Sequence, residues 1–262
     1  MLFPFIGISG VNRVAELSNT LSDIDFTWLE KQGLYIAAGF LTTTSTLSDK
    51  LAINHAQRFI TAKELKSIAP TPLHRVKYII HHRSDSQNQL LNDMCKIAEL
   101  SKDAFSAIQI DEISGLAFPD AKILKSFTRK YPQITLILQV GPQALEKIGS
   151  DLLLLRRELA QYSKIVGGLL LDRSDSRGIQ LDPNELSPIV QMLSEDFPDY
   201  HLIIAGGLNT MNMSCISSLF KINSKLSIDA ESVFFEGKGE DEVFNTSTIQ
   251  EYLSAYKKAL EI

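Results

Sequence analysis

The sequence predicts an α/β fold of the (β/α)8 TIM barrel class, as a single domain over residues 1–262. Short apolar runs alternate with longer amphipathic stretches along the whole chain, which is typical of βαβ units around a parallel sheet. Eight such units occur, and the length suits a barrel, which usually has about 250 residues. An open doubly wound sheet is the rival architecture. The first expected strand is not followed by G-x-G-x-x-G, so closure is favoured.

Eight expected strands are short and rich in aliphatic residues. They are Pro4–Ser9, Tyr35–Leu41, Val76–His81, Ala107–Ile110, Thr135–Val140, Gly168–Asp172, Leu202–Ala205 and Leu226–Ala230. Most of the expected helices carry apolar residues at i, i+3 and i+4 spacing. They are Val14–Leu21, Ala62–Ile68, Gln87–Leu100, Ala121–Tyr131, Gln143–Tyr162, Glu185–Phe197, Met211–Phe220 and Ser247–Leu260.

Two polar segments interrupt this alternation. Thr42–Gln57 follows the second strand and Asp172–Asp182 follows the sixth. Both are expected to be loops at the carboxyl ends of the strands, where barrel enzymes keep their active sites. Such loops can close over a ligand. For Thr42–Gln57 a solvated insertion is an equally good interpretation.

Composition restricts the partners. The net charge is -5 and the 26 basic residues are scattered, so no basic surface for nucleic acid is expected. The apolar N-terminus lacks a basic region and predicts a strand, and no apolar run reaches the 18 residues of a membrane span. The two cysteines, Cys95 and Cys215, are expected to be core thiols without a disulfide. We therefore expect a cytoplasmic monomer or homodimer that acts on a small molecule, without nucleic acid or membrane partners.

The strand ends of a barrel share one mouth, so residues distant in sequence meet there. In strand order they are Ser9, Thr42, His81, Asp111, Gln139, Asp172, Gly206, and Asp229 with Glu231. In GLLLDRSDSRG an apolar strand leads directly to Asp172, whose carboxyl group can act as a general acid. Asp229 in LSIDAES has the same placement. For either residue, a structural hydrogen bond or ion pair is the alternative.

Gly206 and Gly207 follow a buried strand in LIIAGGLN. Two glycines let the backbone approach an anion closely, and a helix starting near Asn209 would point its N–H groups at the same place. Barrel phosphate sites commonly form after strands 7 and 8. The alternative is that the glycines make only a tight turn.

No metal or other cofactor is expected. His81, His82 and Asp111 can supply metal ligands, but adjacent histidines on a strand point to opposite faces, and no H-E-x-x-H spacing occurs. Arg58, in the segment after the second strand, can hold a carboxylate through a forked contact.

Several motifs, taken in order, resemble phosphoribosylanthranilate isomerase, the tryptophan-pathway barrel that catalyses an Amadori rearrangement. GLLLD, LIIAGGLN and SIDAES match the last three strands of that family. GISGVN is similar to its first-strand I-C-G-[IL]-T motif, AAGF to its second strand, QRFIT to K-R-Y-I-S, and AIQID to V-Q-L-H. The likeness covers nearly the whole chain.

The resemblance implies roles for individual residues. The family's general acid falls on Asp172, its substrate-binding arginine on Arg58, and its phosphate turn on Gly206 and Gly207. Its general base, a cysteine, falls on Ser9, whose hydroxyl is too weak an acid to form the required anion unaided.

Two further positions depart from the family. The strand-8 phosphate loop, S-S-G in the family, reads Glu231, Ser232 and Val233 here. A carboxylate beside a phosphate costs roughly 1 to 4 kcal/mol at about 4 Å. The histidine of strand 4 falls on Asp111, which can take part in the base function.

Three functions remain open. One is an isomerase of this type on a phosphoribosyl or related sugar phosphate, with Asp172, Ser9 and Asp111 as catalytic residues. Its substrate is expected to contact Arg58, Gly206, Gly207, Asn209, Asp229, Glu231 and Ser232. The second is an acid–base enzyme acting on another sugar-like substrate. The third is a non-catalytic binding or scaffold protein that has kept the fold.

Overall fold

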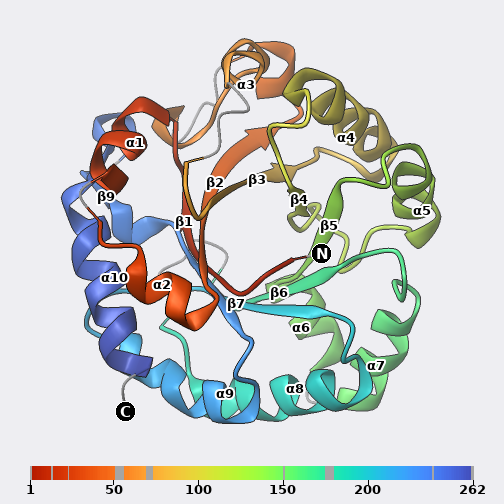
Figure 1. The fold of residues 1–262 in the computed structure, drawn as a ribbon. Coiled ribbons are helices and arrows are strands. Elements are labelled where there is room, and N and C mark those ends of the chain that lie inside the picture. The colour runs from red at the N-terminus through yellow and green to blue at the C-terminus, as the bar shows by residue number, and fades with distance from the viewer. Residues whose placement is uncertain are drawn as a thin grey trace.

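In a computed structural model of the chain, eight parallel strands form a closed barrel inside a ring of helices (Figure 1). The structure describes residues 2–12, 14–22, 24–50, 56–68, 73–149, 151–174, 180–237 and 239–260. Each strand pairs with the next one along the chain, and the eighth pairs with the first, Ile6 standing opposite Ile228. The predicted (β/α)8 barrel is confirmed.

The barrel strands agree with the predicted ranges to within two residues at each end. They are β1 (Phe5–Ser9), β2 (Tyr35–Thr43), β3 (Val76–Arg83), β4 (Ala107–Ile110), β5 (Thr135–Val140), β6 (Gly168–Asp172), β7 (His201–Ala205) and β8 (Ser227–Ala230). A short antiparallel pair that the sequence did not predict, β9 (Phe235–Glu236) and β10 (Val243–Phe244), follows β8.

The helices of the ring are α1 (Val14–Ser22), α2 (Thr27–Gln32), α3 (Ala62–Ser67), α4 (Gln87–Ser101), α5 (Ala121–Lys130), α6 (Pro142–Ile148), α7 (Leu152–Ala160), α8 (Pro183–Asp196), α9 (Ser217–Ile222) and α10 (Ser247–Leu260). Single 3-10 turns occur at η1 (Thr46–Ser48), η2 (Ala56–Arg58), η3 (Met213–Ile216), η4 (Ser232–Phe234) and η5 (Gly239–Asp241). The short helix α2 was not predicted.

Two predicted helices are wrong in detail. The helix expected over Gln143–Tyr162 is divided into α6 and α7, because Gly149 adopts a φ of 60° and Asp151 begins a new helix by accepting a hydrogen bond from the N–H of Leu154. The helix expected over Met211–Phe220 is a turn followed by η3 and α9. Local turn and capping chemistry therefore overrides the apolar spacing in both places.

Side chains alternate between two cores along each strand. Those facing outward pack against the helices and form the larger core, to which Ile6 and Ile8 of β1 belong. The inward-facing set is smaller and closes the middle of the barrel. It comprises Phe5, Ala37, Ile79, Ala107, Ile137, Leu170, Ile203 and Ala205. The barrel is therefore filled, as is usual for eight strands, and ligands can enter only at an end.

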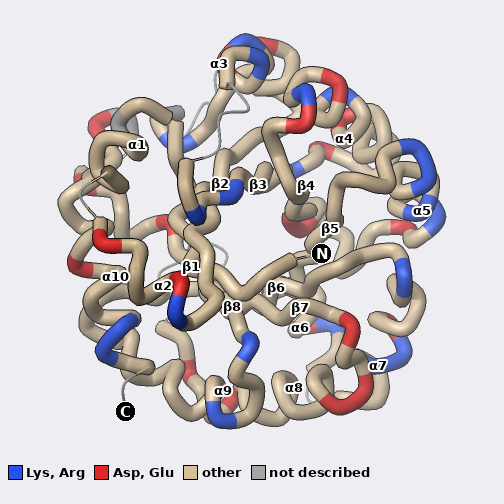
Figure 2. Tube along the Cα trace, in the orientation of Figure 1, with Lys and Arg blue, Asp and Glu red and all other residues tan. Residues whose placement is uncertain are grey.

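Charged residues of both signs are interspersed around the helix ring (Figure 2), so neither sign gathers on one side. This agrees with the scattered basic residues of the sequence. Among the described helices, none is long and apolar enough to cross a membrane. Cys95 and Cys215 are free thiols, as predicted, but both are only half-buried.

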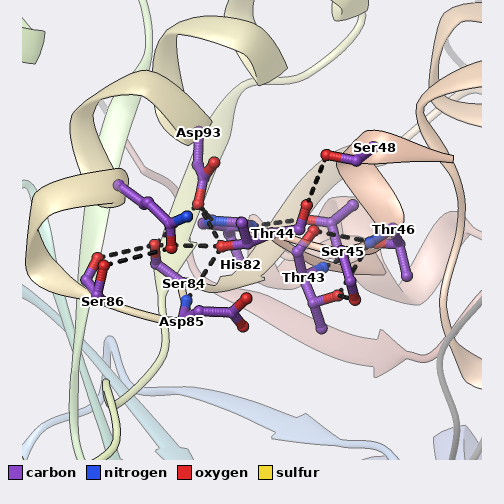
Figure 3. Close-up of polar contacts among 12 residues, drawn as sticks. Thr43, Thr44, Ser45, Thr46, Ser48, His82, Ser84, Asp85, Ser86 and Asp93 are labelled. Atoms are coloured by element: carbon purple, nitrogen blue, oxygen red, sulfur yellow. Dashed lines mark hydrogen bonds and ion pairs between the residues drawn. The ribbon is translucent and has the colours of Figure 1, made fainter. Parts of the chain in front are cut away.

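A buried polar cluster fixes the start of the segment after β2 (Figure 3). The Oδ2 atom of Asp93 on α4 accepts hydrogen bonds from Thr44 Oγ1 at 2.6 Å and Ser84 Oγ at 2.8 Å, and lies 3.1 Å from His82 Nε2. The other ring nitrogen of His82 lies 3.0 Å from Thr42 Oγ1. The first part of the predicted loop is therefore anchored to α4. Residues 51–55 of that loop and residues 175–179 of the loop after β6 lie outside the described residues.

We predict that Asp93→Asn destabilises the fold by about 1 to 3 kcal/mol at neutral pH, because it disturbs three buried hydrogen bonds. Burial raises the pKa of Asp93, but the hydrogen bonds from His82, Thr44 and Ser84 outweigh it and hold the pKa below its usual value. A depressed pKa stabilises the fold above the unfolded pKa near 4. The stabilisation is lost as pH falls through the folded pKa.

Urea unfolding at pH 7 and at progressively lower pH measures this difference. The control is Asp199→Asn, which alters an exposed carboxylate. If both variants unfolded with the same free energy as the parent at pH 7, the cluster would contribute nothing measurable.

Candidate active site

Polar side chains close the carboxyl end of the barrel interior because of the two-residue period of a strand. The inward-facing apolar residues Ile79, Ala107, Ile137 and Leu170 are followed two positions later by His81, Gln109, Gln139 and Asp172. Ser9 on β1 and Asp229 on β8 complete this layer. Thr42 is not part of it, contrary to the sequence analysis. Ala37 of β2 faces inward, and side chains alternate along a strand. Thr42 therefore lies on the outward face of β2, beside His82.

A cavity of about 80 Å³ lies above this layer. Its wall includes most of the predicted site residues, namely Asp111, Asp172, Gly206, Gly207, Asp229, Glu231 and Ser232. Three predicted site residues, Ser9, Arg58 and Asn209, are not among the described residues of the wall. The carboxylates and the glycine turn therefore line one cavity. Ser9, which the resemblance aligns with a catalytic base, is buried behind the cavity wall.

Ser9 belongs to a row of hydrogen-bonded side chains that crosses the mouth from β8 to β4. Its Oγ donates to Asp229 Oδ1 at 2.7 Å and lies 3.3 Å from His81 Nε2. The Nε2 amide of Gln109 lies 3.0 Å from His81 Nδ1 and 3.0 Å from Asp111 Oδ1. Five side chains from four strands are thus linked in one row.

The direction of these hydrogen bonds follows from the two carboxylates, Asp111 and Asp229, at the ends of the row. A carboxylate only accepts, so Gln109 turns its NH2 group toward Asp111 and donates its other proton to His81 Nδ1. The ring proton of His81 is then on Nε2, which donates to Ser9, and Ser9 donates to Asp229. Asp229 is therefore the final acceptor of the chain.

Two glycines make room for this arrangement. A Cβ atom on Gly7 would lie 2.0 Å from Asp229 Oδ1, and one on Gly39 would lie 2.3 Å from Ser9 Oγ and 2.8 Å from His81 Nε2. These distances are impossible for real side chains. The small residues of β1 and β2 thus allow a carboxylate and a hydroxyl to occupy the barrel interior.

The surroundings of Asp229 shift the pKa of its carboxyl group. Burial raises its pKa to about 6, and the charges of Glu231 and Asp172 act in the same direction. His81, when its ring carries a second proton, and the hydrogen bond from Ser9 oppose the rise. A carboxyl group with a pKa near 6 can exchange protons with a substrate at neutral pH.

Asp172 ends β6 on another side of the same cavity. Its Oδ1 accepts hydrogen bonds from the backbone N–H of Ser174 at 2.8 Å and from Ser174 Oγ at 3.0 Å, and its Oδ2 accepts from Gln139 Nε2 at 3.1 Å. The Oε1 of Gln139 in turn accepts from the N–H of Glu112. Gly206 has a φ of 99°, and a Cβ atom there would lie 2.6 Å from Asp172 Oδ1. The absence of a side chain at Gly206 therefore leaves room for the Asp172 carboxylate.

The ends of β7 and β8 present backbone N–H groups at the cavity. In the described part of the chain, no acceptor bonds the N–H groups of Gly207, Leu208 and Ser232, all residues of the wall. No helix begins at Asn209 as the sequence predicted. The Asn209 side chain instead accepts hydrogen bonds from the N–H groups of Met211 and Asn212 and so closes the turn. Any anion here would meet N–H groups of turns rather than a helix end.

Arg58 is bound by two carboxylates. Its Nε and Nη2 donate to the two oxygens of Glu242 at 2.8 and 2.6 Å, and its Nη1 donates to Glu231 Oε1 at 2.7 Å. The guanidinium also lies over the ring of Phe235, 4.6 Å from its centre. The forked contact expected for Arg58 thus exists, but it is made with Glu242 of this chain. Glu231, whose charge argued against a phosphate, is paired with Arg58.

Three residues of the site were missed by the sequence analysis. Gln109 could have been found, because it lies two positions before Asp111 on the inward face of the fourth strand. Ser174 belongs to a polar loop whose conformation follows from no pattern. Glu242 is 184 residues from its partner Arg58, and no spacing signals that pairing.

His82 and Asp93 lie in the cluster of Figure 3, away from the cavity wall, so His81 and His82 do not act together. Within the described residues, no group of three or more histidine, cysteine or acidic side chains is placed to hold a metal ion.

Comparisons with known proteins support the fold. Neither protein-family profiles nor curated protein sequences give a match. Among solved structures, phosphoribosyl anthranilate isomerase from Thermus thermophilus is similar at a TM-score of 0.60 and 15% identity, over 97% of this chain and 98% of that one. A phosphoribosyl anthranilate isomerase in complex with reduced 1-(o-carboxyphenylamino)-1-deoxyribulose 5-phosphate gives 0.59 and 16%, over 98% and 100%. TrpF from Jonesia denitrificans gives 0.58 and 14%, over 98% of each chain. At these identities the chain shares their barrel fold.

Proposed function

We propose that this protein is an acid–base isomerase of a phosphorylated sugar, with Asp172 as its general acid. The observation that carries the proposal is one cavity at the ends of β6, β7 and β8. Its wall contains the Asp172 carboxyl group and the N–H groups of Gly207, Leu208 and Ser232, which no acceptor in the described part of the chain bonds. An acid for the sugar and donors for a phosphate thus stand at one mouth.

The similar barrels support an isomerase reaction as the proposal. One of them was solved with a reduced phosphorylated amino-deoxyribulose, a small molecule that carries a sugar chain and a phosphate. In an Amadori rearrangement an acid protonates the ring oxygen of an N-glycoside, the ring opens to an iminium ion, and a base then removes the proton from C2. The enolamine that results tautomerises to the amino-ketose. Asp172 lines the cavity, where its carboxyl group, in the protonated form, can reach the ring oxygen of a bound sugar.

The size of the cavity limits what can lie in it. About 80 Å³ accommodates a phosphate or one end of a sugar, whereas pockets that enclose a whole drug-sized ligand have roughly 300 to 1,000 Å³. The remainder of a substrate such as an N-arylated ribose phosphate therefore extends into the open mouth.

The test is turnover of phosphoribosylanthranilate by the purified protein. We predict product formation above the rate of a heat-inactivated control. We also predict that ribose 5-phosphate raises the melting temperature more than ribose does, since a ligand at 100 times its Kd stabilises by about 2.7 kcal/mol. No turnover together with equal effects of the two sugars would exclude the proposal.

A variant separates phosphate binding from other effects. Ser232→Asp adds a carboxylate beside the proposed phosphate position and is expected to raise the Kd for ribose 5-phosphate by roughly tenfold, about 1.4 kcal/mol. Ser254→Asp adds the same charge at an exposed position of α10 and is expected to have no effect. Equal affinity of both variants would place the phosphate elsewhere.

A second candidate is acid–base chemistry on an unphosphorylated sugar. The acidic wall favours it, because Asp111, Asp172, Asp229 and Glu231 outnumber the cation Arg83 there. Net negative potential disfavours an anionic ligand. Under this candidate ribose and related polyols stabilise the protein as well as their phosphates do, so the same thermal-shift comparison decides between the two.

A further inference from the structure

We propose that Asp229, and not the residue at the position of Ser9, is the base that removes the carbon-bound proton of the substrate. Ser9 then acts as a positioning residue that holds the Asp229 carboxylate. This inference rests on the proposed function, which needs a base and does not identify it.

Access to the cavity supports this assignment. Asp229 is part of the cavity wall, whereas Ser9 is 1% exposed and lies behind that wall. A substrate proton within the cavity can therefore reach the carboxylate of Asp229, whereas the hydroxyl of Ser9 is covered. A base must come within hydrogen-bond distance of the proton that it removes.

The hydrogen bonds lead to the same assignment. The single proton of Ser9 is already donated to Asp229 at 2.7 Å, and its oxygen faces the Nε2–H of His81 at 3.3 Å. Ser9 could therefore accept a proton from the substrate only by passing its own proton to Asp229. The chain from Asp111 and Gln109 through His81 fixes Ser9, and Ser9 fixes one carboxylate oxygen, which leaves Oδ2 of Asp229 for the substrate.

The electrical surroundings of Asp229 suit a base near neutral pH. Asp172 of β6 and Glu231 after β8 add negative charge, and His81 of β3 opposes it only when its ring carries a second proton. On α10, burial and then the charge of Asp229 raise the pKa of Tyr252 well above 10, so Tyr252 stays protonated. Burial is the main reason that the pKa of Asp229 reaches about 6.

The proton balance is complete with two carboxyl groups. Asp172 gives its proton to the ring oxygen as the C–O bond breaks. Asp229 takes the proton from C2 as that C–H bond breaks, and the electron pair forms the C=C bond of the enolamine. The later tautomerisation moves a proton from the C2 hydroxyl to C1 with no net change. Exchange with solvent returns Asp229 to its anion and Asp172 to its acid.

The experiment measures kcat and KM for phosphoribosylanthranilate between pH 5 and 8. Asp229→Asn is expected to lower kcat at least 100-fold with little change in KM. Ser9→Ala is expected to lower kcat less than tenfold and to move the acidic limb of the kcat/KM profile, near pH 6 in the parent, to higher pH, because the hydrogen bond that lowers the pKa of Asp229 is lost. A purely structural role of Ser9 would not move this limb.

Two results would overturn the assignment. One is an Asp229→Asn protein that keeps more than a tenth of the parent kcat. The other is a Ser9→Ala protein that loses as much kcat as Asp229→Asn without a shift of the limb.

A measurement without substrate separates this inference from the proposed function. In protein labelled with ¹³C at aspartate carboxyl groups, a resonance that is absent from Asp229→Asn is expected to titrate near pH 6 and to titrate higher in Ser9→Ala. If the parent protein neither turns over the substrate nor is stabilised more by ribose 5-phosphate than by ribose, the proposed isomerase is excluded while this titration still supports Asp229 as the basic group of the cavity. Titration below pH 5 would overturn its assignment whatever the turnover.

Discussion

Asp172→Asn is expected to lower kcat for phosphoribosylanthranilate by about 10² to 10⁴ with little change in KM, because the amide cannot donate the proton that opens the sugar ring. The substrate still finds the N–H groups of Gly207, Leu208 and Ser232, so binding is retained. Steady-state kinetics at neutral pH measure both quantities.

The variant needs a control for its hydrogen bonds. Asp172 Oδ2 accepts from Gln139 Nε2, and an amide NH2 group at that position would face another donor. Gln139 cannot rotate its amide group by 180° without losing a hydrogen bond, since its Oε1 accepts from the N–H of Glu112 at 2.9 Å. Gln139→Leu removes the contact and keeps the acid, and we expect it to lower kcat less than tenfold. Equal losses in the two variants would mean that Asp172 only positions its neighbours.

The strands were predictable because their signal is local. Buried strands of a parallel barrel read as apolar runs, and GLLLD or LIIA between polar segments admits few alternatives. The inward or outward direction of each side chain then follows from its position in the strand. The direction was predicted wrongly for Thr42. Because β2 extends to Thr43, the inward-facing positions at its end are odd-numbered, and Leu41 rather than Thr42 lines the cavity.

The helices were less predictable where turns divide them. Gly149 and Asp151 stop and restart a helix within an apolar pattern that continues through both. Asn209 closes a turn with its own side chain, although Asn before an apolar stretch also fits a helix start. Side-chain hydrogen bonds to the local backbone compete with helix formation, and sequence spacing alone does not tell which will form.

The site was predictable in its members and not in its connections. Strand-end positions gave Asp111, Asp172 and Asp229, and all three line the cavity. The resemblance placed the base at Ser9, yet only the contacts reveal that this hydroxyl donates to Asp229. Such a link depends on the stagger of β1 against β8, which brings together residues 220 positions apart.

Arg58→Leu is expected to destabilise the fold by about 3 to 5 kcal/mol, because a buried ion pair that loses one partner leaves a charge without its counterion. The side chains of Arg58 and Glu242 are 10% and 6% exposed. At roughly 2 to 4 °C per kcal/mol, the melting temperature should fall by about 6 to 20 °C. Arg129→Leu, which alters an exposed arginine on α5, is the control and should change it by less than about 2 °C.

The double variant Arg58→Leu with Glu242→Leu distinguishes the two roles of Arg58. If the arginine serves the ion pair, removing Arg58 and Glu242 together restores most of the melting temperature, since apolar residues can replace a buried pair at little cost and the remaining partner, Glu231, is 25% exposed. The resemblance instead gives Arg58 a substrate contact. In that case the double variant regains stability but binds ribose 5-phosphate no better than the single one. Recovery of both properties would assign Arg58 to the ion pair with Glu242, and recovery of stability alone would assign it to the substrate.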